Sequence, residues 1–193
     1  DINSYFATML QQENPHLRGK PVGVTKSEGR NCLIAVSKEA KKYGVKTGCR
    51  LKDALPLCPD IICLPAQFDR YLDATHRLKK VFHDISPDVR IYSLDEAFVD
   101  ISSCLRYLYS DPVDVAQKVQ ANIKKELGEW VTCNVGISYN HLLCKMASNS
   151  APKGEIMTVT PENKDLLLAS VGFEDVCGDW FSAGEKTRSN GSD

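Results

Sequence analysis

The chain has 193 residues, 42% of them apolar and 25% charged, as is ordinary for a soluble globular protein of one or two domains. The net charge of −1 argues against a polyanionic partner, but residues 13–67 carry ten Lys and Arg against five Asp and Glu. A basic segment in an otherwise acidic chain suits a phosphate-contacting surface beside a metal site; chance segregation of charge is the plainer alternative. No apolar run is long enough to cross a bilayer, so no membrane partner is expected.

The first third of the chain alternates short elements with turns. Apolar spacing predicts a helix at residues 4–12, which Asn14-Pro15 breaks. Strands are predicted at 21–26, 32–36 and 61–64, and short helices at 37–43 and 54–58. We expect Ser37 to cap the first of these short helices and Gly44 to end it.

The remainder contains longer and more regular elements. Residues 68–85 have the clearest helical period, with apolar residues at steps of three and four. Further helices are predicted at 112–127, 140–147 and 165–171, and strands at 89–94, 97–101, 131–138 and 155–159. This order predicts an α+β fold in which antiparallel strands are backed by helices on one face. Residues 179–193 lack an apolar period, and we expect disorder there.

Eight cysteines would suit a disulfide framework in a small secreted domain. Most of them lie within apolar runs, however, and none forms a CxxC pair. The four histidines show no ligand spacing with the cysteines, so a zinc site is not expected. We expect buried, reduced thiols and a location in the bacterial cytoplasm.

Two adjacent carboxylates, Asp95 and Glu96, lie between the two strands predicted at 89–94 and 97–101. Neighbouring side chains of a strand point to opposite faces, so both acids can reach one cation only where the backbone turns. Asp1 adds a third carboxylate where the chain begins abruptly, as if it were a fragment whose first strand residues were missing. Three carboxylates suit Mg²⁺. Solvated turn acids are the simpler interpretation, but the apolar setting leaves little water for two anions.

The stretch Tyr92–Phe98 resembles the S-x-D-E-A motif of Y-family translesion DNA polymerases, the group that includes bacterial DNA polymerase IV and the UmuC-like enzymes. Three further matches follow the family's order, at residues 1–7, 39–45 and 135–147. Four ordered motifs are far more specific than any one of them.

The resemblance implies a domain organisation. A ferredoxin-like polymerase palm would comprise residues 1–12 and 68–160, with a small α/β fingers domain inserted at 13–67. The start of a truncated thumb would follow at 161–178, because the family's later thumb and little-finger sequences have no counterpart here.

The same resemblance implies site residues. Asp95 and Glu96 would be the catalytic acids and would hold two Mg²⁺ ions together with Asp1 and Ile2. The incoming nucleotide would be bound by the segment Asn3, Ser4, Tyr5 and Phe6. Phe6 would act as a steric gate whose ring leaves no room for a 2′-hydroxyl; the alternative is an ordinary core aromatic.

Three lysines depart from the family pattern. Lys38 and Lys41 stand where many members carry a Tyr and an Arg that bind the triphosphate, and Lys153 lies two residues beyond the usual lysine position. Lysine supplies positive charge as a point rather than as a bidentate fork. Nucleotide binding is therefore expected to be weaker or differently arranged, with solvated surface lysines as the alternative.

The implied reaction is template-directed, error-prone transfer of a deoxynucleotide from dNTP to a primer 3′-hydroxyl. The implied partners are primer–template DNA and dNTP, with a sliding clamp reached through C-terminal parts absent from this sequence and with the protein a monomer. One alternative is a catalytically inactive remnant that binds DNA or protein. A nucleotidyl cyclase, which shares paired acids on a similar sheet, is a weaker alternative because of the four ordered motifs.

Overall fold

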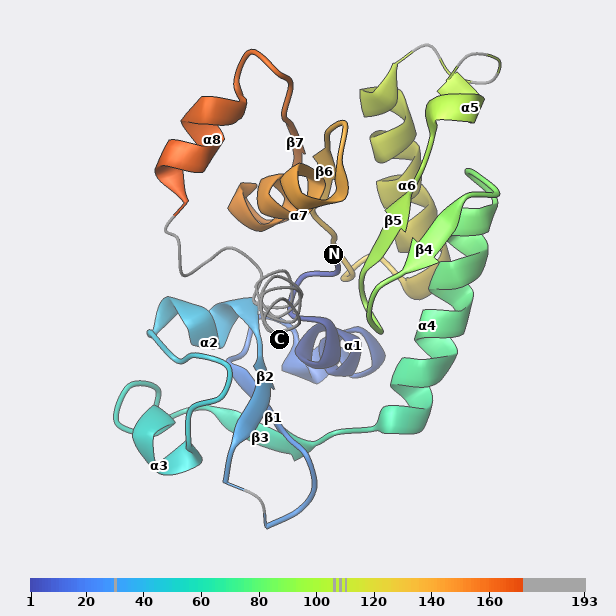
Figure 1. Ribbon diagram of the computed structural model, residues 1–193. Coiled ribbons are helices and arrows are strands. Elements are labelled where there is room, and N and C mark those ends of the chain that lie inside the picture. The colour runs from blue at the N-terminus through green and yellow to red at the C-terminus, as the bar shows by residue number, and fades with distance from the viewer. Residues whose placement is uncertain (30, 106, 108, 110, 172–193) are drawn as a thin grey trace, which may run out of the picture.

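The computed structural model (Figure 1) describes residues 1–29, 31–105, 107, 109 and 111–171. A small sheet with short helices lies at the lower left of the view, and two long helices lie at the right. Helix α1 (Tyr5–Glu13) runs between these two groups. No helix among the described residues is long and apolar enough to span a membrane.

Residues 13–67 fold around a three-stranded sheet with the order β2–β1–β3. Its strands are β1 (Val22–Thr25), β2 (Leu33–Val36) and β3 (Ile62–Pro65); β1 is antiparallel to β2 and parallel to β3. The single turn η1 (Pro15–Leu17) precedes the sheet, and helix α2 (Lys38–Lys42) follows β2. The cap at Ser37 is confirmed, because its Oγ accepts a hydrogen bond from the Ala40 N–H at 3.3 Å.

The helix predicted at 54–58 is wrong in position. Helix α3 occupies Leu51–Ala54 instead. Pro56 has no N–H to donate to the Lys52 carbonyl, so the α-helical hydrogen bonds cannot continue through it.

The second group of elements contains the two long helices and four short strands. Its elements are α4 (Phe68–His83), β4 (Val89–Ile91), β5 (Ala97–Val99), α5 (Ser102–Leu105), α6 (Pro112–Leu127), β6 (Val135–Ile137), α7 (His141–Ser150) and β7 (Ile156–Thr158). All but α5 match predicted elements. Helix α6 begins as expected, since Asp111 Oδ1 accepts from the Val113 N–H at 2.7 Å and Pro112 occupies the first turn.

The main core lies between α4, α6 and the strands. Helix α4 buries Tyr71, Leu78 and Phe82, and α6 buries Val119 and Ile123 against it. These positions follow the helical periods in the sequence, whereas Phe68 and Leu72, on the same period of α4, are exposed.

The α+β class is confirmed, although the strands do not all pair antiparallel. β4 and β5 form the predicted antiparallel hairpin, with Arg90 opposite Phe98. β6 and β7 pair in parallel, with Val135 opposite Ile156. Helix α7 connects β6 to β7 and returns the chain to its starting end, which is the crossover that a parallel pair requires.

Only part of the predicted thumb start is described. Helix α8 (Lys164–Ser170) matches the helix predicted at 165–171. Residues 172–178, and the tail at 179–193 for which disorder was expected, lie outside the described residues.

Candidate active site

The loop between β4 and β5 carries the two adjacent acids at a tight turn. The N–H groups of Tyr92 and Ser93 both donate to the Glu96 carbonyl, at 3.0 and 3.2 Å. Thr75 of α4 anchors the loop, since its Oγ1 donates to the Leu94 carbonyl at 2.7 Å. The turn releases Asp95 and Glu96 from the strict alternation of strand side chains.

The main chain at residues 1–3 lies between this loop and the segment that leads into β6. The Ile2 N–H donates to the Asp95 carbonyl at 3.1 Å, and the Asn134 N–H donates to the Asp1 carbonyl at 2.9 Å. Ile2 also forms an isolated antiparallel bridge with Cys133. These bonds bring Asp1 beside the acidic loop although the two are far apart in the sequence.

The carboxylates of Asp1 and Glu96 converge on one ammonium group, that of Lys145 in α7. Lys145 Nζ lies 3.1 Å from Asp1 Oδ2 and also contacts Glu96 Oε1. The side chain of Lys145 is 14% exposed, that of Glu96 19% and that of Asp1 28%. Because the site is partly desolvated, neither acid could lose its counter-charge without a cost in free energy.

Close packing of α7 on β6 fixes the position of Lys145. A Cβ added at Gly136 would lie 2.0 Å from the Cys144 carbonyl oxygen and 2.6 Å from the Ser148 nitrogen. Both contacts are with backbone atoms of α7, which cannot move aside singly. Only glycine therefore allows the helix to approach the strand this closely.

The third carboxylate, Asp95, faces the adjacent serine. Asp95 Oδ1 accepts a hydrogen bond from Ser93 Oγ at 2.8 Å. Burial lowers the pKa of the Asp1 ammonium, and the negative charges of Glu96 and Asp95 act in the opposite direction. The charge of Asp95 is thus within electrostatic reach of the amino group of Asp1.

The oxygen ligands that these acids offer are of the kind that a hard divalent cation prefers. Asp1, Asp95 and Glu96 all offer carboxylate oxygens, and two of them already share one positive charge. The Ile2 side chain is buried in the core, so only its carbonyl could join them. No three His, Cys, Asp or Glu side chains within the described ranges converge tightly enough to form a metal site as they stand. Asp95 would have to turn away from Ser93 to complete one.

Asp1 and Glu96 are accessible from a cavity of about 710 Å³. Asp1, Glu96 and Lys145 line part of its wall, and apolar residues of α6, including Val115 and Val119, line another part. The site is therefore open rather than sealed within the core.

The residues from Asn3 to Tyr5 form the turn into α1. Asn3 is buried, and its Nδ2 donates to Asn134 Oδ1 at 3.1 Å. Ser4 has a φ of 51°, in the left-handed region. The Tyr5 hydroxyl is buried and donates to the Tyr71 carbonyl at 2.7 Å. The side chains of Asn3 and Tyr5 thus hold the fold, and nucleotide contacts at these two positions would come from the main chain.

Phe6 lies partly in the core and partly at the surface. Its ring stacks on Tyr71, with centroids 4.4 Å apart and planes 18° apart, and meets Phe68 edge-on. These contacts hold the ring in one orientation, and the core-aromatic interpretation accounts for its buried part.

Of the three predicted lysines, two approach each other. Loss of hydration and the positive charge of Lys153 lower the pKa of Lys41, so α2 and the loop before β7 bring two ammonium groups into the same region. Lys38 points elsewhere: its Nζ lies 4.4 Å from the centre of the Trp130 ring, a cation–π contact.

Lys145 is the site residue that the sequence interpretation did not single out, although it lies within one of the matching motifs. The available signal was a lone cation in the otherwise apolar run from Leu142 to Ala147. Thr75 gave no signal, because its role depends on the packing of α4 against a loop distant in sequence.

The chain is similar in sequence to proteins named DNA polymerase IV. DNA polymerase IV of Pelotomaculum thermopropionicum is 41% identical over 150 residues, which cover 77% of this chain and 37% of that protein. DNA polymerase IV of Akkermansia muciniphila is 30% identical over 193 residues, which cover 97% of this chain and 52% of that protein. The chain thus spans about half or less of the length of these relatives.

Solved structures show the same fold. The insertion ternary complex of Dbh DNA polymerase matches with a TM-score of 0.82 at 22% identity, and DinB from Sulfolobus solfataricus with 0.82 at 23%. In both cases the match covers 92% of this chain and 52% of the other. The resemblance to Y-family polymerases is confirmed, and because the family model matches residues 1–149, the chain belongs to the impB/mucB/samB family.

Proposed function

We propose that the chain is the palm and fingers portion of a translesion-type DNA polymerase, which transfers a deoxynucleoside monophosphate from dNTP to a primer 3′-hydroxyl. The observation that carries the proposal is the convergence of Asp1 and Glu96 on Lys145, beside Asp95. It places the acids of two distant motifs together in a family whose similar members are named DNA polymerase IV. Palm residues would be 1–12 and 68–160, fingers 13–67, and the thumb would begin at 161–178.

Asp1, Asp95 and Glu96, with the Ile2 carbonyl, would hold two Mg²⁺ ions. When bound, such a pair would lower the pKa of the primer 3′-hydroxyl and neutralise the charge of the leaving pyrophosphate. The protein's part is to keep three carboxylates close together in a partly dry site, where their mutual repulsion favours cations of high charge. Lys145 offsets part of that repulsion in the metal-free protein.

The remaining predicted residues would bind and select the nucleotide. Lys41 and Lys153 would both supply positive charge to the triphosphate, since desolvation and the charge of Lys153 lower the pKa of Lys41. Phe6 would exclude a 2′-hydroxyl, because its stacking on Tyr71 leaves the ring little freedom to turn aside. Lys38, which lies against Trp130, would have to leave that ring to reach a phosphate.

We further propose that primer–template DNA and dNTP are the partners, that a sliding clamp would be bound through parts beyond these residues, and that the protein is a cytoplasmic monomer. The fold and the relatives named DNA polymerase IV support the DNA partner.

A primer-extension assay with Mg²⁺ tests the proposal. Asp95→Ala combined with Glu96→Ala should abolish extension, whereas Asp60→Ala combined with Glu129→Ala, which removes two exposed acids elsewhere, should leave it intact. Extension that survives the first double substitution would refute the assignment. If the folded wild-type chain gives no extension and no Mg²⁺-dependent heat of dNTP binding in calorimetry, it is instead a non-catalytic remnant.

A further inference from the structure

Trp130 lies in the segment between α6 and β6 and faces two cations of residues 13–67. Lys38 Nζ lies 4.4 Å from the centre of the indole ring, and Arg18 Cζ lies 5.7 Å from it. The face of an aromatic ring attracts positive charge. The indole therefore links the group of elements that contains the acids to the group built around the three-stranded sheet.

Hydrogen bonds to α1 fix the indole in place. Trp130 Nε1 donates to Gln11 Oε1 at 3.1 Å, and the Trp130 N–H donates to Gln12 Oε1 at 2.9 Å. Gln11 is 1% exposed, and its Nε2 donates to Glu39 Oε2 at 2.9 Å. Gly128 allows the close approach, because a Cβ there would lie 2.3 Å from Gln12 Cδ. The ring thus has a fixed position relative to both α1 and α2.

Of the two cations on the ring, Lys38 is the one that is free to move. Arg18 Nε and Nη2 donate to the carbonyls of Gln11 and Gln12, at 3.1 and 3.0 Å, which fixes the guanidinium. The Lys38 side chain is 55% exposed, and its ammonium lies 4.0 Å from Glu39 Oε1 in a long ion pair. An exposed ion pair or cation–π contact changes an equilibrium constant by about fivefold at most. A phosphate ligand can therefore draw the Lys38 ammonium off the ring.

Lys38 starts from the same helix as Lys41. The two lysines are three residues apart on α2, so their side chains are neighbours on the helix surface. The positive charge of Lys153 acts on Lys41, which brings a third lysine into this region. A Lys38 ammonium that left Trp130 would add to the attraction that the other two exert on a triphosphate.

We propose that Trp130 is a positioning residue that holds Lys38 away from the triphosphate and competes with the nucleotide for its charge. In the nucleotide-free protein the ammonium lies on the indole, and binding of the triphosphate draws it towards Lys41. Because the cation–π contact must break, nucleotide binding is weaker than it would be without the ring. The inference rests on the proposed function for the identity of the ligand, but Trp130 itself would not touch the nucleotide.

The fluorescence of Trp130 tests the movement of Lys38. The chain has two tryptophans, so the full chain carrying Trp180→Phe retains only the emission of Trp130. Titration with inorganic triphosphate in the presence of Mg²⁺ should shift this emission, because a charge leaves the ring face. Adding Lys38→Met to that background should abolish the shift at saturating triphosphate. Triphosphate binding without a change in emission, or no triphosphate binding at all, would overturn the proposal.

A double-mutant cycle tests the competition between the ring and the phosphate. Calorimetry gives the dissociation constant for inorganic triphosphate in Trp130→Leu, Lys38→Met and the combined variant. Trp130→Leu should bind about two- to fivefold more tightly than wild type, which is the strength of an exposed cation–π contact. In the Lys38→Met background the same change should have no effect. Trp130→Phe, which keeps an aromatic face but not the Nε1–H, should give an intermediate affinity.

Two results of the cycle would contradict the inference. Weaker binding in Trp130→Leu would show that the ring presents Lys38 to the phosphate. An equal effect of Trp130→Leu with and without Lys38 would show that the indole only supports the fold. The fluorescence measurement leaves Trp130 unchanged, so it decides the question even if Trp130→Leu fails to fold.

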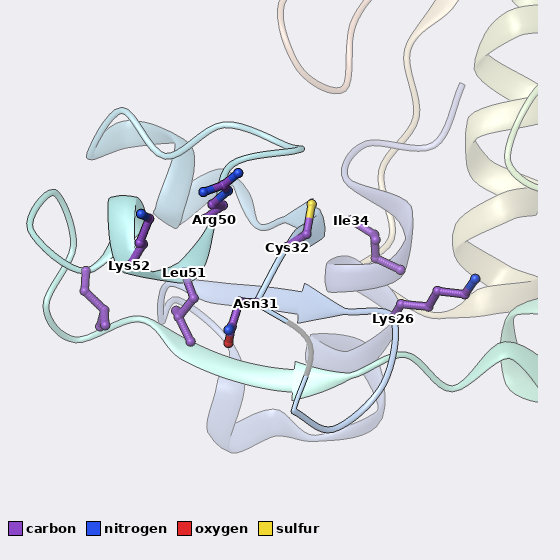
Figure 2. A pocket seen from close by; sticks show the side chains of 8 residues that line it. Lys26, Asn31, Cys32, Ile34, Arg50, Leu51 and Lys52 are labelled. Atoms are coloured by element: carbon purple, nitrogen blue, oxygen red, sulfur yellow. The ribbon is translucent and has the colours of Figure 1, made fainter.

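Lys52 gives the matched control for the loss of one positive charge. It lies on α3 and lines a separate cavity of about 820 Å³, whose described lining residues do not include Trp130 (Figure 2). Lys52→Met should preserve both the emission shift and the tighter binding caused by Trp130→Leu. Loss of either effect in Lys52→Met would attribute it to general attraction between the protein and the anion, and would overturn the role of Lys38.

The inference and the proposed function can fail separately. If Asp95→Ala with Glu96→Ala leaves extension unaffected, the polymerase assignment fails, yet the emission shift with inorganic triphosphate can still be observed. If extension requires those acids while Trp130→Leu acts equally with and without Lys38, only the present inference fails.

Discussion

Lys145 Nζ lies 3.1 Å from Asp1 Oδ2, and the same ammonium contacts Glu96. A divalent cation bound by these carboxylates must therefore compete with an internal one. Lys145→Met removes the competitor while keeping much of the side-chain volume. We expect the dissociation constant for Mn²⁺ or Mg²⁺ to fall severalfold, and the metal-free protein to lose about 1–3 kcal/mol of stability, because two partly buried anions lose their partner. Calorimetric titration and denaturant unfolding measure the two effects.

Lys118→Met on α6 is the control, since the ammonium of Lys118 interacts with Tyr109 and lies outside the acid site. It should change neither metal affinity nor stability by much. Weaker metal binding in Lys145→Met would show that the lysine holds the acids in place for the metal instead of competing with it.

The acidic loop depends on Thr75 as well. Thr75→Val keeps the shape of the side chain but removes the hydrogen bond to the Leu94 carbonyl. Loss of this bond should cost about 1 kcal/mol in unfolding free energy. Because the loop carries Asp95, metal affinity should also weaken by a few fold. Unchanged metal affinity at reduced stability would show that the loop keeps its position without α4.

The sequence predicts the long helices and the two adjacent acids, but not every residue of the site or every strand pairing. The apolar periods of Phe68–His83 and Pro112–Leu127 predict the buried faces of these helices, because residues on one face of a helix recur every three to four positions. Asp95 and Glu96 could be identified from local sequence as well. The role of Lys145 could not be deduced in this way, since it depends on a helix meeting a loop and the N-terminal segment in space. The parallel pairing of β6 with β7 likewise depends on a crossover that strand periodicity does not reveal.

Gly136 should be the glycine least tolerant of substitution among those described in the second group of elements. Gly136→Ala places a methyl group against the backbone of α7, and we expect a loss of about 3 kcal/mol or more. Gly23→Ala is the comparison, since its Cβ would meet the Leu33 side chain at 2.9 Å, which can move. A smaller loss of about 1 kcal/mol is expected there. Equal losses in chemical denaturation would contradict the proposed role of helix–strand contact.

Tyr5 should make the protein sensitive to alkali. Burial raises the pKa of its phenol above the ordinary value of 10.0. Near neutral pH both folded and unfolded chains keep the proton, so this group has no effect on the pH dependence. Between the unfolded pKa and the higher folded pKa, only the unfolded chain ionises, and stability falls as the pH rises. Tyr5→Phe should make that fall shallower, whereas Tyr43→Phe, at an exposed position, should leave it unchanged.

Phe6 offers the sharpest test of substrate selection. Its ring is held flat against Tyr71, so replacement by alanine opens space beside the proposed sugar position. We expect the ratio of ribonucleotide to deoxynucleotide incorporation to rise on the order of tenfold or more in Phe6→Ala. The same change should cost about 2–3 kcal/mol of stability, because the partly buried ring packs against the core. Phe68→Ala is the control: Phe68 also contacts the Phe6 ring but lies on α4 and is more exposed, so discrimination should persist. If Phe6→Ala still extends with dNTP and rejects ribonucleotides as wild type does, the ring is a core aromatic and another group selects the sugar.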